Sequence, residues 1–258
     1  MAQVVQTAHA APKADLWPIW DASGSETGMQ HEQWQQILTA YVRPDEEGLN
    51  RVDYQAIRET GQDQLESYLK YAASIDPRTY TRDEQMAYWI NVYNALTIQV
   101  VLRYPNKGSI LRMGEKLFAI GPWDDAVFTV AGESLTLNDI EHRILRPIWR
   151  DHRIHYAVNC ASVGCPNLST QAYSAASLEE QLASAEKTYL THPRGLLIEG
   201  NKAKLSSIFK WYRSDFGEEE SDVLTYMSEF NAPLNDLLEQ GRRVRTSYDY
   251  DWSLNEAK

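Results

Sequence analysis

The segment from Glu84 to Arg103 constrains the fold of this chain more than any other. It is the longest apolar segment, and its apolar residues fall on every side of a helix of about 3.6 residues per turn. A helix that is apolar all round needs cover on all sides, so we expect this one to be the buried central helix. Thr81-Arg82-Asp83-Glu84 before it has the pattern of a capping box, and Pro105 ends it.

Asn91 and Asn94 interrupt the apolar surface of this helix. Their spacing of three places them on one face. Because a buried amide must find hydrogen-bond partners, each asparagine either clamps neighbouring backbone or faces a polar pocket. The clamp is the more frequent case.

The second informative segment is Asp151–Leu168, which holds both cysteines of the chain, Cys160 and Cys165. The alternation over Arg153–Asn159 predicts a strand with cover on both faces. Small residues and Cys165-Pro166 then end the strand. A buried strand that opens into a loop with two thiols either presents a reactive group or places a disulfide.

The remaining chain mixes helices with hairpins. This order predicts an α+β fold in which a largely antiparallel sheet packs against helices around the central one. Residues 1–16 are expected to be flexible and residues 17–258 to form a single domain. The expected helices cover 29–42, 51–75 with an interruption near Gly61, 137–145 with Pro147 as its end, 177–190, 207–212, 222–230 and 234–240; the expected hairpins turn at 131–133 and 200–201, and a last strand covers 243–252.

Several spaced blocks carry a resemblance to a known family. They are NCASVGCPNL, AYWINVYNALTIQVVLRYP at 87–105, LNDIEHRILR at 137–146, SSIFKWYRSDFG at 206–217 and YDYDWSLN at 248–255. Together they make residues 82–255 resemble the domain-of-unknown-function 547 family, which implies a domain and no reaction. The helix-first order around a thiol site is similar, by analogy, to papain-like and transglutaminase-like folds. Those folds place the nucleophile at a helix start, whereas Glu84–Arg103 has no cysteine.

Charge and hydrophobicity exclude some partners. The net charge of −11 disfavours nucleic acid and anionic membranes, which need concentrated Lys and Arg. No apolar run approaches the roughly 18 residues that span a bilayer, so we expect no membrane insertion. A peptide or a small molecule remains as the expected ligand, and we predict no cofactor. Ala8-His9-Ala10 resembles the end of a signal peptide, which favours an exported, periplasmic protein with its signal trimmed; a cytoplasmic location is the alternative.

The first functional hypothesis is a cysteine-dependent hydrolase or acyl transferase. Cys165 or Cys160 is the nucleophile, and His142 or His155 is the base. Five residues of strand, about 16 Å, separate His155 from Cys160, so Cys165 on the return path is the easier match. Asn159 or Asn94 orients the histidine, as an amide does in some cysteine hydrolases.

The second hypothesis is a non-catalytic binding or scaffolding domain. A Cys160–Cys165 disulfide, formed in an oxidising compartment, staples its loop, and Ala161–Asn167 is its contact surface. The two cysteines with the two histidines are a weak zinc set, so we predict no metal. Glu141 is expected to be solvated, and Asp215 to pair with Arg213 or cap a turn. The sequence leaves open whether the protein is an enzyme.

Overall fold

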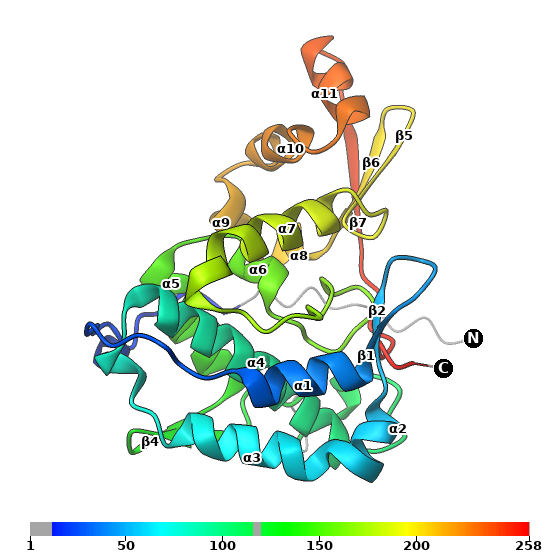
Figure 1. The fold of residues 1–258 in the computed structure, drawn as a ribbon. Helices are drawn as coiled ribbons and strands as arrows, with labels where there is room; N and C mark the ends of the chain where they lie inside the picture. The colour runs from blue at the N-terminus through cyan, green and yellow to red at the C-terminus, as the bar shows by residue number, and fades with distance from the viewer. Residues whose placement is uncertain (1–11, 116–119, 258) are drawn as a thin grey trace.

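The central helix is α4 (Arg82–Arg103), around which the other elements are arranged (Figure 1). The computed structural model describes residues 12–115 and 120–257. Every residue of α4 from Glu84 to Ile98 is buried, which confirms the predicted central helix. The capping box is not formed as expected, because the Thr81 side chain makes no capping bond and the Glu84 carboxylate accepts hydrogen bonds from the N–H groups of Gly28 and Met29.

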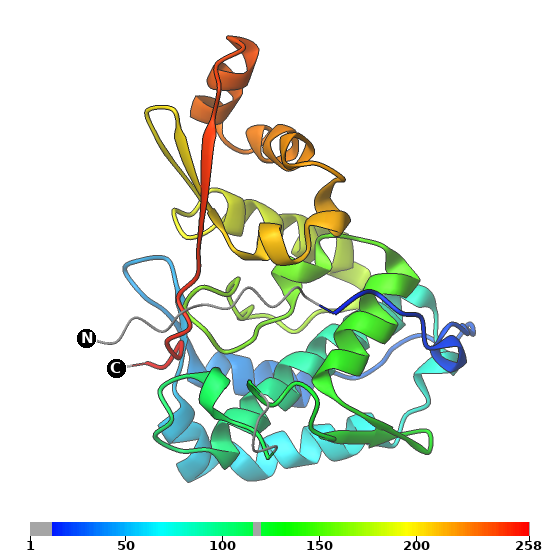
Figure 2. The ribbon, with the colours of Figure 1, turned by 180° about the vertical axis from the view of Figure 1, so that it is seen from behind.

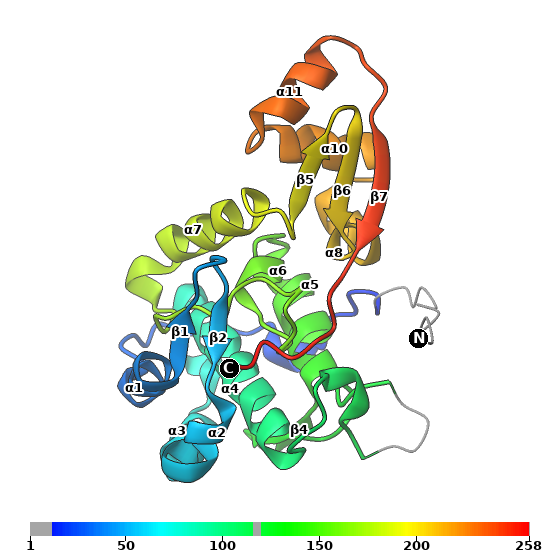
Figure 3. The same cartoon turned by 90° about the vertical axis from the view of Figure 1, so that its right-hand side faces the viewer.

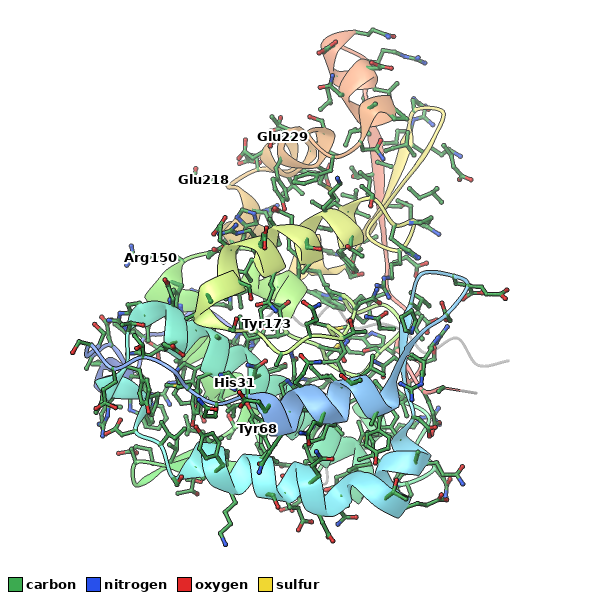
Figure 4. All side chains as sticks on the ribbon, viewed as in Figure 1. His31, Tyr68, Arg150, Tyr173, Glu218 and Glu229 are labelled. Atoms are coloured by element: carbon green, nitrogen blue, oxygen red, sulfur yellow. The ribbon has the colours of Figure 1, made fainter. Side chains whose placement is uncertain are left out.

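The helices of the N-terminal half pack around α4. Gly61 ends a π-helical turn between α2 and α3, so the predicted interruption is confirmed; a Cβ there would lie 2.7 Å from the Tyr41 ring. At the start of α1, His31 faces Tyr68 of α3, with 3.1 Å between Nδ1 and the hydroxyl (Figure 4). The elements are η1 (Pro18–Trp20), α1 (Glu32–Tyr41), α2 (Tyr54–Ala56), η2 (Ile57–Gly61), α3 (Gln62–Ala73), η3 (Pro77–Thr79) and η4 (Ile110–Arg112).

The helices of the C-terminal half are mostly short. Those expected at 177–190, 207–212, 222–230 and 234–240 are present within a few residues of the predicted ends. The elements are the π-helical η5 (Asp139–Leu145), α5 (Arg146–Trp149), α6 (Ile154–Ala157), η6 (Ala175–Ser177), α7 (Leu178–Leu190), α8 (Ile208–Trp211), α9 (Arg213–Phe216), α10 (Glu220–Ser228) and α11 (Ala232–Glu239).

The strands form three small sheets and not one. Both predicted hairpins and the last strand are confirmed. The predicted single sheet is wrong, because the strands of the described residues fall into separate small sheets; the predicted antiparallel pairing is confirmed except for the last strand, which joins its neighbour in parallel. With no common sheet, the papain-like analogy is not supported. The strands are β1 (Val42–Pro44) with β2 (Asn50–Val52), β3 (Phe128–Val130) with β4 (Glu133–Leu135), and β5 (Leu196–Glu199), β6 (Lys202–Ser206) and β7 (Arg245–Asp249).

The predicted strand at Arg153–Asn159 is wrong. Residues Ile154–Ala157 form the helix α6, and the chain becomes extended only at Val158. All four residues of α6 are buried. When every position is buried, alternation carries no information about period, and a short apolar run fits a buried helical turn as well as a strand.

Pro147 does not end its helix. The chain continues from η5 into α5, with Pro147 in the first turn of α5. Proline has no N–H to give to the carbonyl four residues earlier, which belongs to Arg143. That carbonyl accepts the Trp17 N–H at 3.0 Å, and the neighbouring His142 carbonyl accepts the Asp15 N–H at 3.0 Å. The end of the segment expected to be loose therefore lies along η5; most of that segment is outside the described residues.

Two hydrophobic clusters meet at α6. The larger surrounds α4 and includes Ile154, whereas the second includes Tyr156 and lies between α7, α8, α10 and the β5–β7 sheet. Figure 3 shows this sheet above the α4 region, with β7 leading downward. From behind, the red C-terminal segment runs from β7 down into the lower half of the molecule (Figure 2). Within the described ranges, no helix is both long and apolar enough to span a bilayer.

Candidate functional site

The loop Asn159–Pro166 follows α6 at the junction of the two clusters. Asn94 of α4 holds its start, since its amide donates to the Ala157 carbonyl at 2.9 Å and accepts the Asn159 N–H at 2.8 Å. Asn159 then spans the loop, accepting the Ala161 N–H and donating to the Pro166 carbonyl at 2.9 and 2.7 Å. These contacts hold Ala161 in a left-handed conformation with φ of 60°, which is unusual for a residue other than glycine.

Both asparagines of α4 clamp backbone, as the more frequent of the two expected cases requires. The Asn91 side chain accepts the backbone N–H of Tyr173 at 2.9 Å and donates to the Tyr173 carbonyl at 2.8 Å. Tyr173 lies beside the N-terminal end of α7 (Figure 4). Asn94 and Asn159 contact each other and the loop backbone, and neither contacts a histidine among the described residues. In this structure they position the loop.

Cys160 and Cys165 face each other across this loop. The Cys160 N–H donates to the Cys165 Sγ at 2.9 Å, and both cysteines are free. The predicted disulfide is therefore not present in this structure. The two residues differ in exposure, because Cys160 is partly exposed and Cys165 is buried.

Three hydrogen-bonding groups surround the Cys160 sulfur. The hydroxyls of Ser162 and Tyr250 both lie 3.0 Å from it. A hydrogen bond with the Cys165 thiol, together with these hydroxyls, lowers the pKa of Cys160 against the opposing effect of burial. Burial and the hydrogen bond with Cys160 raise the pKa of Cys165. Of the two cysteines, Cys160 is therefore the one that ionises more readily.

Tyr250 reaches this thiol from the far end of the chain. The segment after β7 pairs with the loop, since the N–H groups of Val163 and Gly164 donate to the carbonyls of Ser253 and Asp251 at 2.9 and 2.8 Å. Glycine is required at position 164, where a Cβ would lie 2.8 Å from the Asp251 nitrogen. This pairing covers the loop. In the expected contact surface at Ala161–Asn167, only Val163 and Asn167 are partly exposed and the other residues are buried, so most of this segment is not available for contact.

Aromatic rings lie next to the thiol. The Tyr250 ring is 4.8 Å from the Trp211 ring and 4.6 Å from the Trp252 ring, measured between centroids. The Trp123 ring lies 6.1 Å beyond Trp252. The three tryptophans are partly exposed, and Trp211 and Trp252 pack on the cluster that Cys160 also contacts. The thiol therefore lies beside an accessible apolar and aromatic surface.

Arg194 approaches the loop from the Cys165 side. Its guanidinium donates to the Val163 carbonyl at 3.2 Å and to the Asn167 side chain at 2.7 Å. Its Nε is buried without a partner among the described residues. Burial lowers the pKa of Arg194. This arginine places a positive charge within electrostatic range of Cys165.

The two candidate histidines lie together in a separate buried network. Their Nδ1 atoms are 3.9 Å (His142) and 3.7 Å (His155) from Glu141 Oε1. His155 Nε2 is 2.7 Å from Asp215, which also forms a two-point ion pair with Arg146 at 2.6 and 2.9 Å. Arg146 donates to His142 Nδ1 at 3.1 Å. The imidazoles are therefore engaged with carboxylates and an arginine, and not with sulfur.

Glu141 and Asp215 correct two expectations. Glu141 was expected in solvent, but it is buried, because η5 is covered by α4 on one side and by the histidine network on the other. Burial opposes ionisation of Glu141, but His142, His155 and Arg146 outweigh it and lower the pKa. Asp215 pairs with Arg146 and not with Arg213. Burial alone would raise the pKa of Asp215, but hydrogen bonds from His155 and Arg146 hold it well below its usual range.

The thiol group and the histidine group are separate but close. Over residues 12–115 and 120–257, no hydrogen bond joins either histidine to either sulfur, and no three metal-binding side chains are grouped to hold an ion. Tyr93 of α4 lies between the groups. Its hydroxyl donates to Glu141 at 3.1 Å, and burial, Glu141 and Cys160 raise its pKa. Cys160 is thus within electrostatic range of the network, although not in contact with it.

Several site residues were not predicted from the sequence: Ser162, Tyr250, Tyr93, Tyr212, Arg146 and Arg194. Tyr250 and Tyr212 stand inside two of the blocks that carry the family resemblance, YDYDWSLN and SSIFKWYRSDFG. Those blocks were the feature of the sequence that could have pointed to the two tyrosines. The tyrosines in them were not candidates, because an aromatic residue more often packs in the core than takes part in chemistry.

The structure therefore defines an α+β protein with a buried thiol loop and an adjacent histidine–carboxylate network. Residues 77–190 match the model of a family described as protein of unknown function, DUF547. This match confirms the resemblance for the central helix, η5 and the thiol loop; the blocks at 206–217 and 248–255 lie beyond it. No curated protein and no solved structure gives a significant match to the chain.

Proposed function

We propose that this protein is a cysteine-dependent acyl transferase or hydrolase in which Cys160 is the nucleophile. The observation that supports it is the surroundings of the sulfur of one partly exposed cysteine, which has two hydroxyls at 3.0 Å and a pKa lowered by its hydrogen bond with the neighbouring Cys165 thiol. A thiolate is the reactive form of cysteine, and hydrogen bonds to the charged form favour it. Cys165 is buried and its pKa is raised, so it is not the nucleophile.

The reaction proceeds through a thioester. The Cys160 thiolate attacks an acyl carbon, a C–S bond forms, and the bond to the leaving group breaks. The leaving group takes a proton from solvent, because burial and the nearby cysteines raise the pKa of Tyr250 and keep its hydroxyl protonated. Water or an acceptor nucleophile then attacks the thioester, and the thiolate is released. In this proposal Asn94 and Asn159 position the loop, and the histidine network holds a fixed charge behind Tyr93.

The surroundings of Cys160 favour an apolar or aromatic acyl group. The partly exposed rings of Trp211 and Trp252 pack on Tyr250, whose hydroxyl contacts the thiol, and rings of this kind bind flat and apolar groups through area and stacking. The net charge of −11 disfavours strongly anionic substrates over much of the surface. An uncharged aromatic ester or thioester is the first substrate to examine.

Reaction with p-nitrophenyl phenylacetate tests this proposal. We expect a rapid release of one nitrophenolate per protein and an acyl group on the Cys160 peptide, seen by mass mapping after acid quench. Cys160→Ala is expected to abolish both signals. Cys165→Ser keeps the nucleophile and a hydrogen-bond donor at position 165, so it serves as the matched control and is expected to retain the acyl adduct. Wild-type protein that carries no acyl group on Cys160, or equal labelling of the Cys160→Ala variant, contradicts the proposal.

A further inference from the structure

We infer that Cys160 and Cys165 also act as a dithiol pair that exchanges with small-molecule disulfides, with Cys160 as the attacking and Cys165 as the resolving cysteine. This activity rests on the same nucleophile as the proposed function but needs the second sulfur as well. Acyl transfer uses Cys165 only as a hydrogen-bond donor. Disulfide exchange uses it as a reactant.

The geometry of the pair supports exchange in one direction. Cys160 is partly exposed and can meet a reagent from solvent, whereas Cys165 is buried behind it. The Cys165 sulfur already lies 2.9 Å from the Cys160 backbone nitrogen and 3.9 Å from the Val158 carbonyl. A turn closed by the Cys165 N–H and the Ser162 carbonyl, at 3.1 Å, keeps the two cysteines on facing sides of the loop. The buried sulfur therefore needs little movement to reach its partner.

The electrostatics agree with these roles. An attacking thiol reacts as thiolate, and the pKa of Cys160 is lowered by its hydrogen bond with Cys165 and by two hydroxyls. The pKa of Cys165 is raised by burial, so this sulfur stays protonated until its partner has reacted. Once Cys160 is in a mixed disulfide, Cys165 no longer donates to a thiolate, and its proton is free to leave with the departing thiol.

The exchange balances in two steps. The Cys160 thiolate attacks one sulfur of the external disulfide, forms a protein–S–S–R bond and releases one RS⁻. Cys165, after losing its proton to solvent or to RS⁻, attacks the Cys160 sulfur, forms the Cys160–Cys165 bond and releases the second RS⁻. The protein loses two electrons and two thiol protons, and the disulfide gains them as two thiols. Reduction of the bridge by an excess of thiol runs the same steps backward.

The backbone conformation of Ala161 helps to bring the two sulfurs together. This buried residue lies between the cysteines with φ of 60°, a conformation that is unfavourable for a residue other than glycine. The Asn159 amide holds it there through the Ala161 N–H. The loop is thus held by side chains in a form that brings the sulfurs together, and not by a crosslink.

Oxidised glutathione tests the inference. Reduced wild-type protein is mixed with an excess of it near neutral pH, quenched with acid, and examined by intact mass and peptide mapping. We expect an intramolecular bridge with loss of both thiol hydrogens, release of two glutathione thiols, and no lasting adduct. Cys165→Ser is expected to stop at a glutathione adduct on Cys160. Cys160→Ser is expected to react at least about tenfold more slowly than wild type, because its remaining thiol is buried.

The outcomes separate this inference from the proposed function. A stable glutathione adduct on wild-type Cys160 without a bridge overturns the dithiol pair and leaves the nucleophile intact. No reaction at either cysteine overturns both. A fast reaction of Cys160→Ser overturns the assignment of the attacking cysteine. Cys165→Ala replaces Cys165→Ser if the serine variant loses its native circular dichroism, and the same adduct is expected.

Discussion

Replacing Trp89 by alanine is expected to lower the free energy of unfolding by about 3–5 kcal/mol. Trp89 is 1% exposed at the centre of α4, and its ring lies 5.2 Å from Trp20 and 4.9 Å from Tyr88 between centroids. Removing the indole leaves a cavity that this densely packed helix cannot close, because α4 is covered on all sides. Urea unfolding followed by circular dichroism measures the loss as a shift of the midpoint at unchanged slope.

Trp17→Ala is the matched control for this prediction. It makes the same substitution in the same cluster, but Trp17 is only partly buried and its ring packs on Trp20 and Arg143. We expect a distinctly smaller loss of stability. A cost below about 1 kcal/mol for Trp89→Ala, or equal costs for the two variants, would show that α4 is not the centre of the core.

Replacing Asp215 by asparagine is expected to cost about 3–5 kcal/mol at neutral pH. The change removes one negative charge at nearly constant volume. It leaves the Arg146 side chain, which is 5% exposed, without its two-point partner and His155 without its 2.7 Å contact. An uncompensated buried charge is costly because neither water nor another carboxylate replaces the lost contact. Urea unfolding of both proteins at pH 7 gives the difference.

The comparison of wild type with Asp215→Asn also predicts how the free energy of unfolding depends on pH. Because the pKa of Asp215 is depressed in the folded state, its contribution to stability is fully present above its unfolded pKa of about 3.9 and is lost as the pH falls below it. The difference between wild type and Asp215→Asn should therefore shrink between about pH 5 and the acid limit. Asp21→Asn breaks the more exposed ion pair with Arg82 and should cost about 0–1 kcal/mol. Equal costs for both variants would contradict the buried network.

Local patterns predicted the elements whose signals are confined to a few neighbouring residues. The hairpin at Ala131-Gly132 follows from two residues that adopt positive φ, and the β5–β6 turn follows from Gly200. The central helix follows from an apolar surface that no other segment of the chain shows. In these cases the periodicity and the turn chemistry are properties of the segment alone, so no tertiary contact was needed to read them.

The parts of the site that depend on contacts between residues far apart in the sequence were not predicted. Tyr250 is 90 residues from Cys160 and reaches it only because β7 pairs in parallel with β6 and directs the following segment to the thiol loop. Asp215 likewise pairs with a residue that is distant in the sequence, Arg146, which lies 69 residues earlier. The α6 helix was taken for a strand because all its positions are buried. Candidate residues were found by type, but their partners were not, since partners are set by packing and not by spacing.

The pH dependence of Cys160 alkylation tests the central claim most directly. Iodoacetamide labelling of wild-type protein, mapped to the Cys160 peptide, is expected to give an apparent pKa below the free-thiol value of about 8.5. Tyr250→Phe removes one hydrogen bond to the thiolate, worth about 1.5–3 kcal/mol, and should raise that pKa by about one to two units. His142→Gln, which changes a residue not bonded to sulfur, should leave it in place. An apparent pKa at or above that of a free thiol, unmoved by Tyr250→Phe, would contradict the account.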